Sequence, residues 1–232
     1  MKLTLGLLGG ISPAATLDLL GKLQAHTPVQ TDRDHIRVIA DINPSLPDLS
    51  SSILGGGVTL AEMAGALRGA GAQVLAIASN SAHAHADMIQ RASHLPIIDM
   101  IGAACASARA SGVRRVGVLG SRAALRQYRE YLAAQAMGLV ALPQEGQAEF
   151  LETLERLKSG DRGPQVRQAM EAAASALVSE GAELVIAGST SLPLVLSQEA
   201  LRIELIDPGD LLARRCVAVC LGAEPMPQMT AG

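Results

Sequence analysis

The amino-acid sequence contains an internal repeat, and this repeat constrains the fold more than any other feature. The segment 71–81, GAQVLAIASNS, recurs 110 positions later as 181–191, GAELVIAGSTS. A second motif recurs at nearly the same interval, because 6–10, GLLGG, corresponds to 117–121, GVLGS. Each half of the chain therefore carries one glycine-rich segment and one small polar segment after a short apolar run. We predict a pseudo-twofold protein whose site lies between matching loops, which suits chemistry on two opposite faces of one atom.

The composition predicts a well-packed protein that does not bind nucleic acid. With 232 residues, 49% hydrophobic and 18% charged, the chain can form one large domain or two of common size. Its net charge of −3 gives no basic surface for a phosphate backbone. One Phe, two Tyr and no Trp leave few aromatic side chains on which bases could stack. We therefore expect no nucleic-acid partner.

No segment of the sequence predicts a membrane span. The apolar runs are all shorter than the roughly 18 residues that a spanning helix needs. The segment 1–8 has the single cation and short apolar stretch of a signal peptide. However, its counterpart 116–119 lies in mid-chain, where a signal cannot act. We therefore interpret both as buried strands and expect no membrane partner.

The three cysteines are predicted to be core thiols. Cys105, Cys216 and Cys220 lie in Ala-rich, helix-like stretches, and their odd number argues against a disulfide framework. Cys216 and Cys220 are four residues apart, but no nearby His or Cys completes a set of metal ligands. We expect no metal site and a reducing, cytoplasmic location.

Short apolar runs alternate with amphipathic helical patterns along almost the whole chain. Such runs are typical of parallel strands buried on both faces. The predicted strands are Thr4–Leu8, Ile36–Ile42, Val74–Ala78, Ile97–Asp99, Arg115–Leu119, Leu139–Leu142, Leu184–Ala187 and Leu205–Asp207. The predicted helices are Pro13–Ala25, Thr59–Gly69, Ala82–Arg91, Ile101–Ala110, Arg122–Gln135, Gln147–Lys158, Gln165–Ser179 and Pro208–Val219. This alternation predicts an α/β fold of two pseudo-symmetric halves, each a mostly parallel sheet flanked by helices.

The repeat also predicts the domain boundaries. We expect residues 1–100 with 206–222 to form the first α/β half, 101–205 the second half, and 223–232 a loose tail. Ligands of open parallel sheets bind beyond the carboxyl ends of the strands. Because the repeated motifs lie at those ends, we expect a ligand cleft between the two halves.

The first glycine-rich loop, Gly9-Gly10-Ile11-Ser12-Pro13, joins a predicted strand to a helix. Ser12 is a favourable N-cap followed by proline at the first helical position. Free N–H groups at such a helix start attract an anion, which here would be a carboxylate or phosphate. The pattern is not the Gly-x-Gly-x-x-Gly dinucleotide fingerprint, and no acidic ribose partner follows at the usual distance. A tight turn required only for packing is an equally good interpretation of this loop.

The two small polar loops, Ser79-Asn80-Ser81 and Ser189-Thr190-Ser191, each follow a predicted buried strand. Hydroxyl and amide groups at these positions can bind a carboxylate, and they can equally cap the next helix. Their matching places in the repeat favour the functional interpretation.

Several motifs, in order along nearly the whole chain, resemble the aspartate/glutamate racemase family of cofactor-independent amino-acid racemases. Gly9–Thr16 resembles the family's Gly-Gly-x-x-Pro-x-Ala-Thr, and Asp32–His35 its Asp-x-Asp-His segment. Asn43–Asp48 resembles the Asn-Pro-x-x-Pro-Asp segment. Ser79–His83 is similar to the Cys-Asn-Thr-Ala-His loop, and Gly188–Pro193 to the Gly-Cys-Thr-Glu-Leu-Pro loop.

The resemblance implies a mechanism, a ligand and an assembly. In the family, two cysteines stand on opposite faces of the substrate Cα; one thiolate removes the proton and the opposing thiol returns one. The resemblance thus assigns Ser79 and Ser189 to the two acid/base positions and implies no cofactor, a homodimer, and a small amino acid or carboxylate as ligand. The substrate-binding positions that it implies are Gly10, Ile11, Ser12, Asn43, Asn80, Ser81, Ser121, Lys158, Thr190 and Ser191. For Lys158, a solvated helix end is an equally good interpretation.

The chain departs from the family at the positions that carry the chemistry. Both catalytic cysteines are replaced, by Ser79 and Ser189, and a serine hydroxyl ionises too weakly to act as a base without a partner. In addition, Ser191 stands for a family Glu, Leu49 for an Arg that binds a substrate carboxylate, and Ala124 for a Thr. Paired Cys→Ser changes are what an experimenter would make to trap a ligand. The other three changes and the remaining cysteines favour instead a natural divergent member whose ligand is less acidic than aspartate.

The histidines offer one further candidate base. His83 follows Ser79 by four residues, so a Ser/His couple is possible, while a histidine bonded to a neighbouring loop is the alternative interpretation. We expect His85 to lie at the surface and His35 to order the Asp32–Asp34 turn rather than react.

Three functions remain open on these grounds. The first is an enzyme that moves a proton at the carbon next to a carboxyl group. The second is a sensor or regulator that keeps the site and has lost the chemistry. The third is a two-lobed small-molecule binding domain unrelated to racemases.

Overall fold

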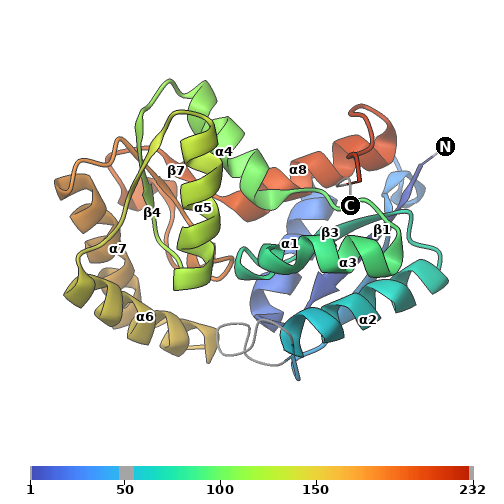
Figure 1. Ribbon diagram of the computed structural model, residues 1–232, viewed down its shortest axis with the longest axis horizontal. Coiled ribbons are helices and arrows are strands. Elements are labelled where there is room, and N and C mark those ends of the chain that lie inside the picture. Colours follow the sequence, from blue (N-terminus) through green and yellow to red (C-terminus); the bar gives the residue numbers. More distant parts are fainter. Residues whose placement is uncertain (1, 47–54, 230–232) are drawn as a thin grey trace. The chain divides into compact units, whose positions relative to one another are not determined.

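The computed structural model describes residues 2–46 and 55–229, which form two units (Figure 1). The first unit comprises Met1–Met100 with Gly209–Gly232, and the second comprises Ile101–Pro208. Within the described residues, no helix combines the length and apolarity that a bilayer span requires.

The first unit is built on a parallel sheet in the order β2-β1-β3. A parallel bridge from Leu75 to Ile97 extends the sheet beyond β3. The strands are β1 (Thr4–Gly9), β2 (Arg37–Ile42) and β3 (Val74–Ile77). The helices are α1 (Pro13–His26), α2 (Gly55–Gly69), α3 (Ala86–Ser93) and α8 (Pro208–Leu221), with 3-10 helices η1 (Asp32–Asp34) and η2 (Ser81–His85).

The second unit has a parallel sheet in the order β5-β4-β6-β7. Its strands are β4 (Arg115–Val118), β5 (Gly138–Val140), β6 (Leu184–Ile186) and β7 (Leu205–Ile206). Its helices are α4 (Met100–Ala110), α5 (Arg122–Ala134), α6 (Gln144–Lys158) and α7 (Pro164–Ser179), with 3-10 helices η3 (Leu192–Leu194) and η4 (Gln198–Ala200). The predicted α/β class, with parallel sheets flanked by helices, is confirmed.

Three details of the prediction are wrong. Ile97–Asp99 forms a single bridge rather than a strand. The helix predicted over Ala82–Arg91 is divided into η2 and α3, because the His83 N–H bonds back three residues to the Asn80 carbonyl. Finally, β2 is not buried on both faces: every residue of Arg37–Ile42 is exposed or half-buried, since β2 is an edge strand.

The two sheets reproduce the sequence repeat residue by residue. In the first sheet Gly6 of β1 pairs with Leu75 of β3, and in the second Gly117 of β4 pairs with Val185 of β6. The next neighbours also correspond, because Leu75 bridges Ile97 and Val185 pairs with Leu205. Strand, helix, turn and strand therefore recur with one register in both units.

Close packing at the central strand also recurs. A Cβ added at Gly6 would lie 2.8 Å from the Ala72 Cβ and 3.4 Å from the Leu67 Cβ. A Cβ at Gly117 would lie 2.9 Å from the Ala182 Cβ and 3.2 Å from the Leu177 Cβ. In each sheet, the helix and turn that precede the neighbouring strand pack directly against the central strand. The central strand therefore needs glycine at this point.

The apolar residues of the first sheet face two separate layers, as alternation along a strand requires. Leu5 and Leu7 of β1 belong to a cluster with residues of α1 and α8, including the fully buried Cys216 and Cys220. Leu8 belongs to another cluster with residues of α2 and α3. All three cysteines are free and buried, which confirms that they are core thiols.

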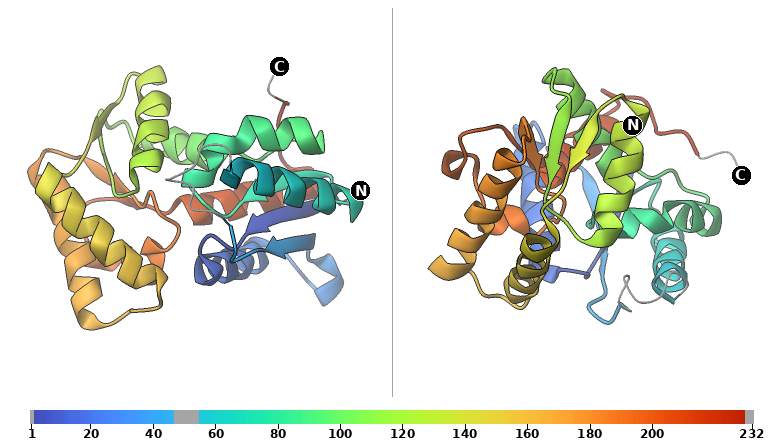
Figure 2. Two further views of the ribbon diagram at one scale, coloured as in Figure 1. Left: turned by 60° about the horizontal axis from the view of Figure 1, so that its bottom comes forward. Right: turned by 60° about the vertical axis from the view of Figure 1, so that its left-hand side comes forward.

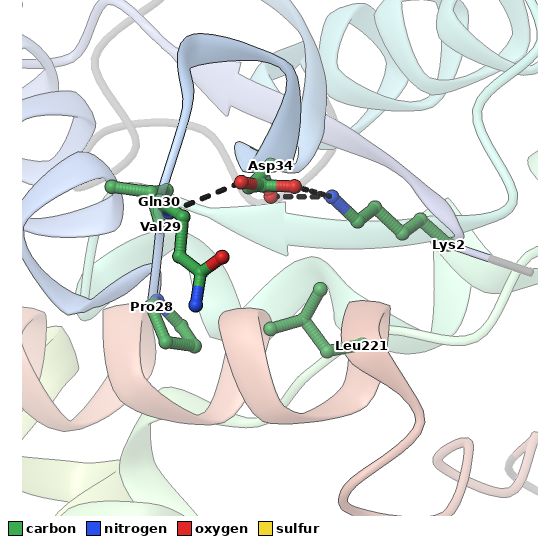
Figure 3. Close-up of a pocket in the computed structure, with 6 residues that line it drawn as sticks. All are labelled: Lys2, Pro28, Val29, Gln30, Asp34 and Leu221. Atoms are coloured by element: carbon green, nitrogen blue, oxygen red, sulfur yellow. Dashed lines mark hydrogen bonds and ion pairs between the residues drawn. The ribbon is translucent and has the colours of Figure 1, made fainter.

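The segment between α1 and β2 is tied to the start of β1. The Lys2 ammonium donates to the backbone carbonyl of Asp34 (Figure 3). It also donates to the backbone carbonyl of Arg33. Lys2 and Asp34 border a pocket of about 560 Å³ that Pro28, Val29, Gln30 and Leu221 also line. The pocket adjoins the amino ends of β1 and β2, so it is not part of the predicted strand-end loops.

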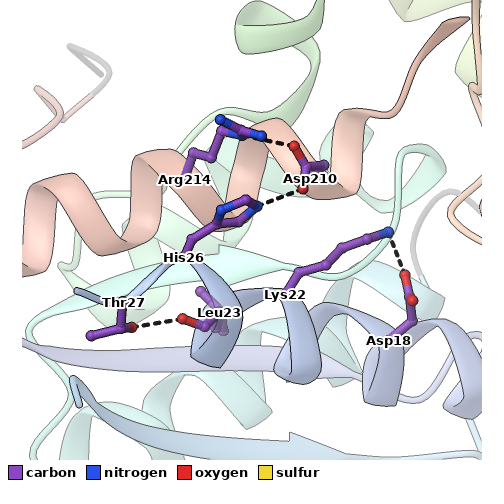
Figure 4. Close-up of polar contacts among 7 residues, drawn as sticks. All are labelled: Asp18, Lys22, Leu23, His26, Thr27, Asp210 and Arg214. Carbon is purple, nitrogen blue, oxygen red and sulfur yellow. Dashed lines mark hydrogen bonds and ion pairs between the residues drawn. The ribbon is translucent and has the colours of Figure 1, made fainter. Parts of the chain in front are cut away.

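A polar network joins α1 to α8 (Figure 4). The Asp210 carboxylate contacts the His26 Nε2 at 2.5 Å and accepts from the Arg214 Nε at 2.8 Å. Burial opposes ionisation of Asp210, but the bonds from His26 and Arg214 outweigh it, so the pKa of Asp210 is lowered. This network holds the C-terminal helix against the first helix of the chain.

We predict that Gly6→Ala and Gly117→Ala each lower the free energy of unfolding by about 1–3 kcal/mol, because each added methyl overpacks its sheet. Gly65→Ala is the control, since an added Cβ at this position in α2 meets nothing within 4 Å. That change should leave stability equal or raise it by up to about 1 kcal/mol. Urea unfolding measures all three; equal midpoints for the Gly6, Gly117 and Gly65 variants would contradict the packing argument.

We further predict that Asp210→Asn lowers the free energy of unfolding by about 1–2 kcal/mol at neutral pH. A carboxylate with a lowered folded-state pKa stabilises the fold above its unfolded pKa, and this contribution disappears as the pH falls through the folded value. The difference from wild type should therefore shrink as the pH falls below the ordinary value of 3.8. Asp18→Asn, which breaks only the Lys22 pair within α1, should cost less than about 0.5 kcal/mol. Equal losses for the two variants would refute a special role for Asp210.

Candidate functional site

The carboxyl ends of the three strands in the first unit lie along one edge of the sheet, because all three strands are parallel. There the loop after β1 and the loop after β2 touch each other. The Asn43 N–H donates to the Gly9 carbonyl at 3.3 Å. Gly10 has φ +108°, and a Cβ at this position would lie 2.2 Å from the Asn43 carbonyl oxygen. The structure therefore brings Gly10 and Asn43 together, and only glycine fits at position 10.

The glycine-rich loop satisfies much of its own hydrogen-bonding capacity. The Ser12 hydroxyl caps α1 by accepting from the Ala15 N–H, as predicted. The Thr16 hydroxyl accepts from the Gly10 N–H at 3.2 Å and donates to the Ser12 carbonyl at 3.1 Å. The expectation of free N–H groups is therefore wrong for Gly10, because Thr16 already occupies that donor.

The loop after β3 holds Ser79 at the end of a fully buried strand. The side-chain oxygens of Ser79 and Ser81 lie 3.2 Å apart, and the Ser79 hydroxyl also accepts from the Ala82 N–H at 3.4 Å. Ser79 is 5% exposed and Asn80 is 2% exposed. Two small hydroxyls thus lie together at the start of η2, where that of Ser79 accepts a backbone N–H of this 3-10 helix.

His83 bonds the backbone on both sides of its ring. Its Nδ1 donates to the Ser79 carbonyl at 2.8 Å, and its Nε2 accepts from the Met100 N–H at 3.2 Å. Burial lowers the pKa of His83, although the Asp99 carboxylate and backbone hydrogen bonds act in the other direction. His83 is therefore neutral, with both nitrogens engaged. The structure contains the histidine-to-loop bond and not the Ser/His couple.

The expectation that His85 lies at the surface is wrong. His85 is 6% exposed rather than at the surface, and a Cβ on Gly57 would lie 2.8 Å from its Nδ1. Burial lowers the pKa of His85. The turn near His35 is ordered by Asp34, whose carboxylate accepts from the N–H groups of Thr31 and Gln30. These bonds lower the pKa of Asp34, and the bond from the Thr31 N–H has the largest effect.

In the second unit, the loops after β4 and β6 also touch. A Cβ at Gly120 would lie 3.0 Å from the Gly188 carbonyl oxygen. The Ser121 hydroxyl caps α5 by accepting from the Ala124 N–H at 3.2 Å. The Gln147 side-chain N–H₂ reaches from α6 and donates to the Gly120 carbonyl at 3.0 Å. The sequence analysis missed Gln147, since a single polar residue in a helical pattern gives no signal of such a distant contact.

Ser189 and Thr190 follow β6 and are half-buried, whereas Ser191 is 1% exposed. The Ser189 carbonyl accepts from the Leu192 N–H at 3.0 Å, and the Ser191 carbonyl from the Leu194 N–H at 3.2 Å. These bonds form η3, which gives the loop after β6 the same 3-10 geometry as η2 after β3. The first unit therefore carries Ser79 and the second carries Ser189 in comparable turns.

The remaining predicted residues divide into those with a described environment and those without. Ile11 is half-buried next to Gly10 and packs against the cluster on the α2 side of the sheet. Lys158 is exposed near the end of α6, where its ammonium pairs with Glu155 at 2.6 Å. Pro47, Asp48 and Leu49 lie outside the described residues.

The cysteine thiols are buried and are poor candidates for a catalytic base. Burial raises the pKa of Cys216 well above its ordinary value and that of Cys220 to about 11. Cys105 is 0% exposed. Within the described parts of the chain, His, Cys, Asp and Glu form no cluster of three or more that could hold a metal ion.

Comparison with known proteins connects this geometry to one family. A family model described as Asp/Glu/hydantoin racemase matches residues 8–230. An aspartate racemase homologue from Pyrococcus horikoshii OT3 is 25% identical, with a TM-score of 0.77 over 95% of this chain and 100% of that chain. The aspartate racemase of Picrophilus torridus is 19% identical, with a TM-score of 0.79 over 94% of each chain. Glutamate racemase from Francisella tularensis, in complex with D-glutamate, is 20% identical, with a TM-score of 0.67 over 99% of this chain and 84% of that chain.

The family model spans nearly the whole chain, and the similar structures share both α/β units over almost their full length. The hypothesis of a two-lobed binding domain unrelated to racemases is therefore wrong. On its fold, its strand-end loops and this match, the chain belongs to the Asp/Glu/hydantoin racemase family.

Proposed function

We propose that this protein binds a small amino acid or carboxylate and moves a proton at the carbon next to the carboxyl group, without a cofactor. One observation carries the proposal. Ser79 and Ser189 follow strands that pair with the central strands in one register, and each begins a turn of small polar residues. Two equivalent groups of this kind suit a reaction that removes a proton from one face of a carbon and returns one to the other.

The proposed roles follow the family pattern. Ser79 and Ser189 stand at the two acid/base positions. Hydroxyl and amide groups of the small polar loops would hold the carboxylate of the ligand. The residues proposed to bind the substrate are Gly10, Ile11, Ser12, Asn43, Asn80, Ser81, Ser121, Lys158, Thr190 and Ser191.

The ligand is proposed to be less acidic than aspartate. Ser191 stands where the family has a Glu, Ala124 where it has a Thr, and Leu49 where it has an Arg that binds a substrate carboxylate. Lys158 is the one cationic side chain among the residues proposed to bind the substrate, and it is already paired with Glu155. A second carboxylate on the substrate would therefore have weak compensation, whereas one carboxylate can be held by hydroxyl and N–H groups.

The second candidate function is ligand binding without turnover, as in a sensor or regulator. The environment of His83 favours it, because both ring nitrogens bond the backbone and neither reaches the Ser79 hydroxyl. Without a partner base, a serine hydroxyl near neutral pH is almost entirely protonated. Racemisation by the wild-type protein is therefore expected to be slow. A cytoplasmic homodimer is the form in which we expect either function to operate.

We predict that restoring both thiols accelerates proton exchange. The wild type and the Ser79→Cys/Ser189→Cys variant are incubated in deuterated water with neutral and acidic amino acids, and Cα deuterium is followed by NMR. Exchange by the double variant should exceed that of wild type by roughly a hundredfold or more, because a thiol pKa near 8.5 lies far closer to neutrality than that of a hydroxyl. Each single variant should favour deuterium incorporation from one enantiomer.

Ser111→Cys is the matched control, because Ser111 is exposed near the end of α4, and this change should add no exchange. Calorimetric binding of an amino acid with no exchange in the wild type supports the sensor. The proposed site would be refuted if neither the wild type nor the double variant shows binding or exchange.

A further inference from the structure

We propose that β2 is an interaction surface for a second copy of this chain, with which it pairs antiparallel across a twofold axis at Ile39. β2 is an edge strand of its sheet. On one side, all of β2 from Arg37 to Ile42 pairs with β1. Among residues 2–46 and 55–229, no strand pairs with its other side. The segment Arg37–Ile42 contains no proline that would prevent pairing.

The direction of the backbone groups determines which registers are possible. The Asn43 N–H points towards β1, where it donates to the Gly9 carbonyl. Backbone groups of successive residues in a strand point to opposite sides, so those of Arg37, Ile39 and Asp41 also face β1. The N–H and carbonyl groups of Val38, Ala40 and Ile42 consequently face outwards. A second copy can bond only to these alternate residues.

Among the registers that this alternation permits, one opposes complementary charges. When Val38 of each copy exchanges hydrogen bonds with Ala40 of the other, Arg37 comes opposite Asp41 on both sides of the axis. These are the non-hydrogen-bonded positions of an antiparallel pair, where opposed side chains approach most closely. A register shifted in one direction leaves Asp41 opposite Ile39, and a further shift opposes the two Asp41 side chains to each other.

Within residues 2–46 and 55–229, the two charged side chains of β2 have no competing ion-pair partners. Arg37 is exposed and Asp41 is half-buried, and neither forms an ion pair with any described residue. Protective charges on an edge strand usually repel a second copy. Here one charge of each sign stands at either end of a five-residue segment, so a second copy is attracted instead.

Apolar contacts continue across the same axis. Ile39 packs at the margin of the cluster on the α2 side of the sheet, and it would meet its own counterpart. On the α1 side, Val38 borders a cavity of about 310 Å³ that Leu20, Leu23 and Ile36 also line. The small Ala40 of the second copy would lie beside Val38 there without a clash. In the left view of Figure 2, β2 is the blue strand that lies below the darker blue β1, at the edge of the sheet.

Charge exchange tests this interface. Sedimentation across a concentration series should give wild type a dimer mass twice the chain mass of 23.9 kDa. Arg37→Asp and Asp41→Arg should each weaken self-association by about tenfold or more, since two attractive pairs become repulsive. Mixing the two variants should restore a dimer, because every opposed pair in the heterodimer then carries opposite charges. Arg33→Asp, the same charge change within η1, should leave the wild-type dissociation constant unchanged.

A second variant tests the backbone pairing without any charge change. Ala40→Pro removes an outward-facing N–H, so the pairing of β2 with β1 keeps its bonds while the dimer loses two. We expect a folded monomer by circular dichroism and sedimentation. A monomeric wild type, a dimer that survives both Ala40→Pro and charge reversal, or a mixture of reversed variants that stays monomeric would each overturn the proposal.

Discussion

At Gly6 and at Gly117 a helix and the turn after it press so closely on a central strand that no side chain fits between them. Leu67 and Ala72 make this contact in the first unit, and Leu177 and Ala182 make it in the second. β1 and β4 are flanked by strands on both sides. The contact therefore fixes how closely each helix and turn approach the central strand of their sheet. In each unit the chain continues from this helix and turn through the neighbouring strand, β3 or β6, to the loop that carries Ser79 or Ser189.

The sequence predicts most of this arrangement because its strongest signals are local and periodic. Apolar runs mark the strands, capping residues such as Ser12 mark helix starts, and the repeat relates the two units. What local pattern lacks is position within a sheet. An edge strand such as β2 and a central strand have similar composition, so the exposure of β2 follows only from the strand order. For the same reason, the apolar run at Ile97–Asp99 was predicted to be a strand, whereas it forms a single bridge.

The sequence predicts where a site would lie, but it does not predict the hydrogen bonds within the loops at that place. The repeat and the family motifs point to the strand-end loops, since parallel strands share one carboxyl edge. Long-range bonds from side chains to backbone decide which groups remain for a ligand. Thr16 occupies the Gly10 N–H, Gln147 holds the Gly120 carbonyl, and His83 links the Ser79 and Met100 backbones. No spacing rule specifies these bonds, because their partners lie on different elements. A shared fold therefore does not by itself determine which loop groups are available to a ligand.

The course of α8 has a consequence for how the chain acquires its structure. Leu212, Cys216 and Val219 of this helix fill the core against β1, and the Leu3 N–H donates to the Cys220 carbonyl. The middle unit, Ile101–Pro208, is continuous in sequence and emerges from the ribosome before α8 does. During synthesis the middle unit can therefore complete its core first, while the earlier-made segment waits with one face of its sheet uncovered. That waiting face, rich in Leu and Val, is where a chaperone would be needed and where premature release would lead to aggregation.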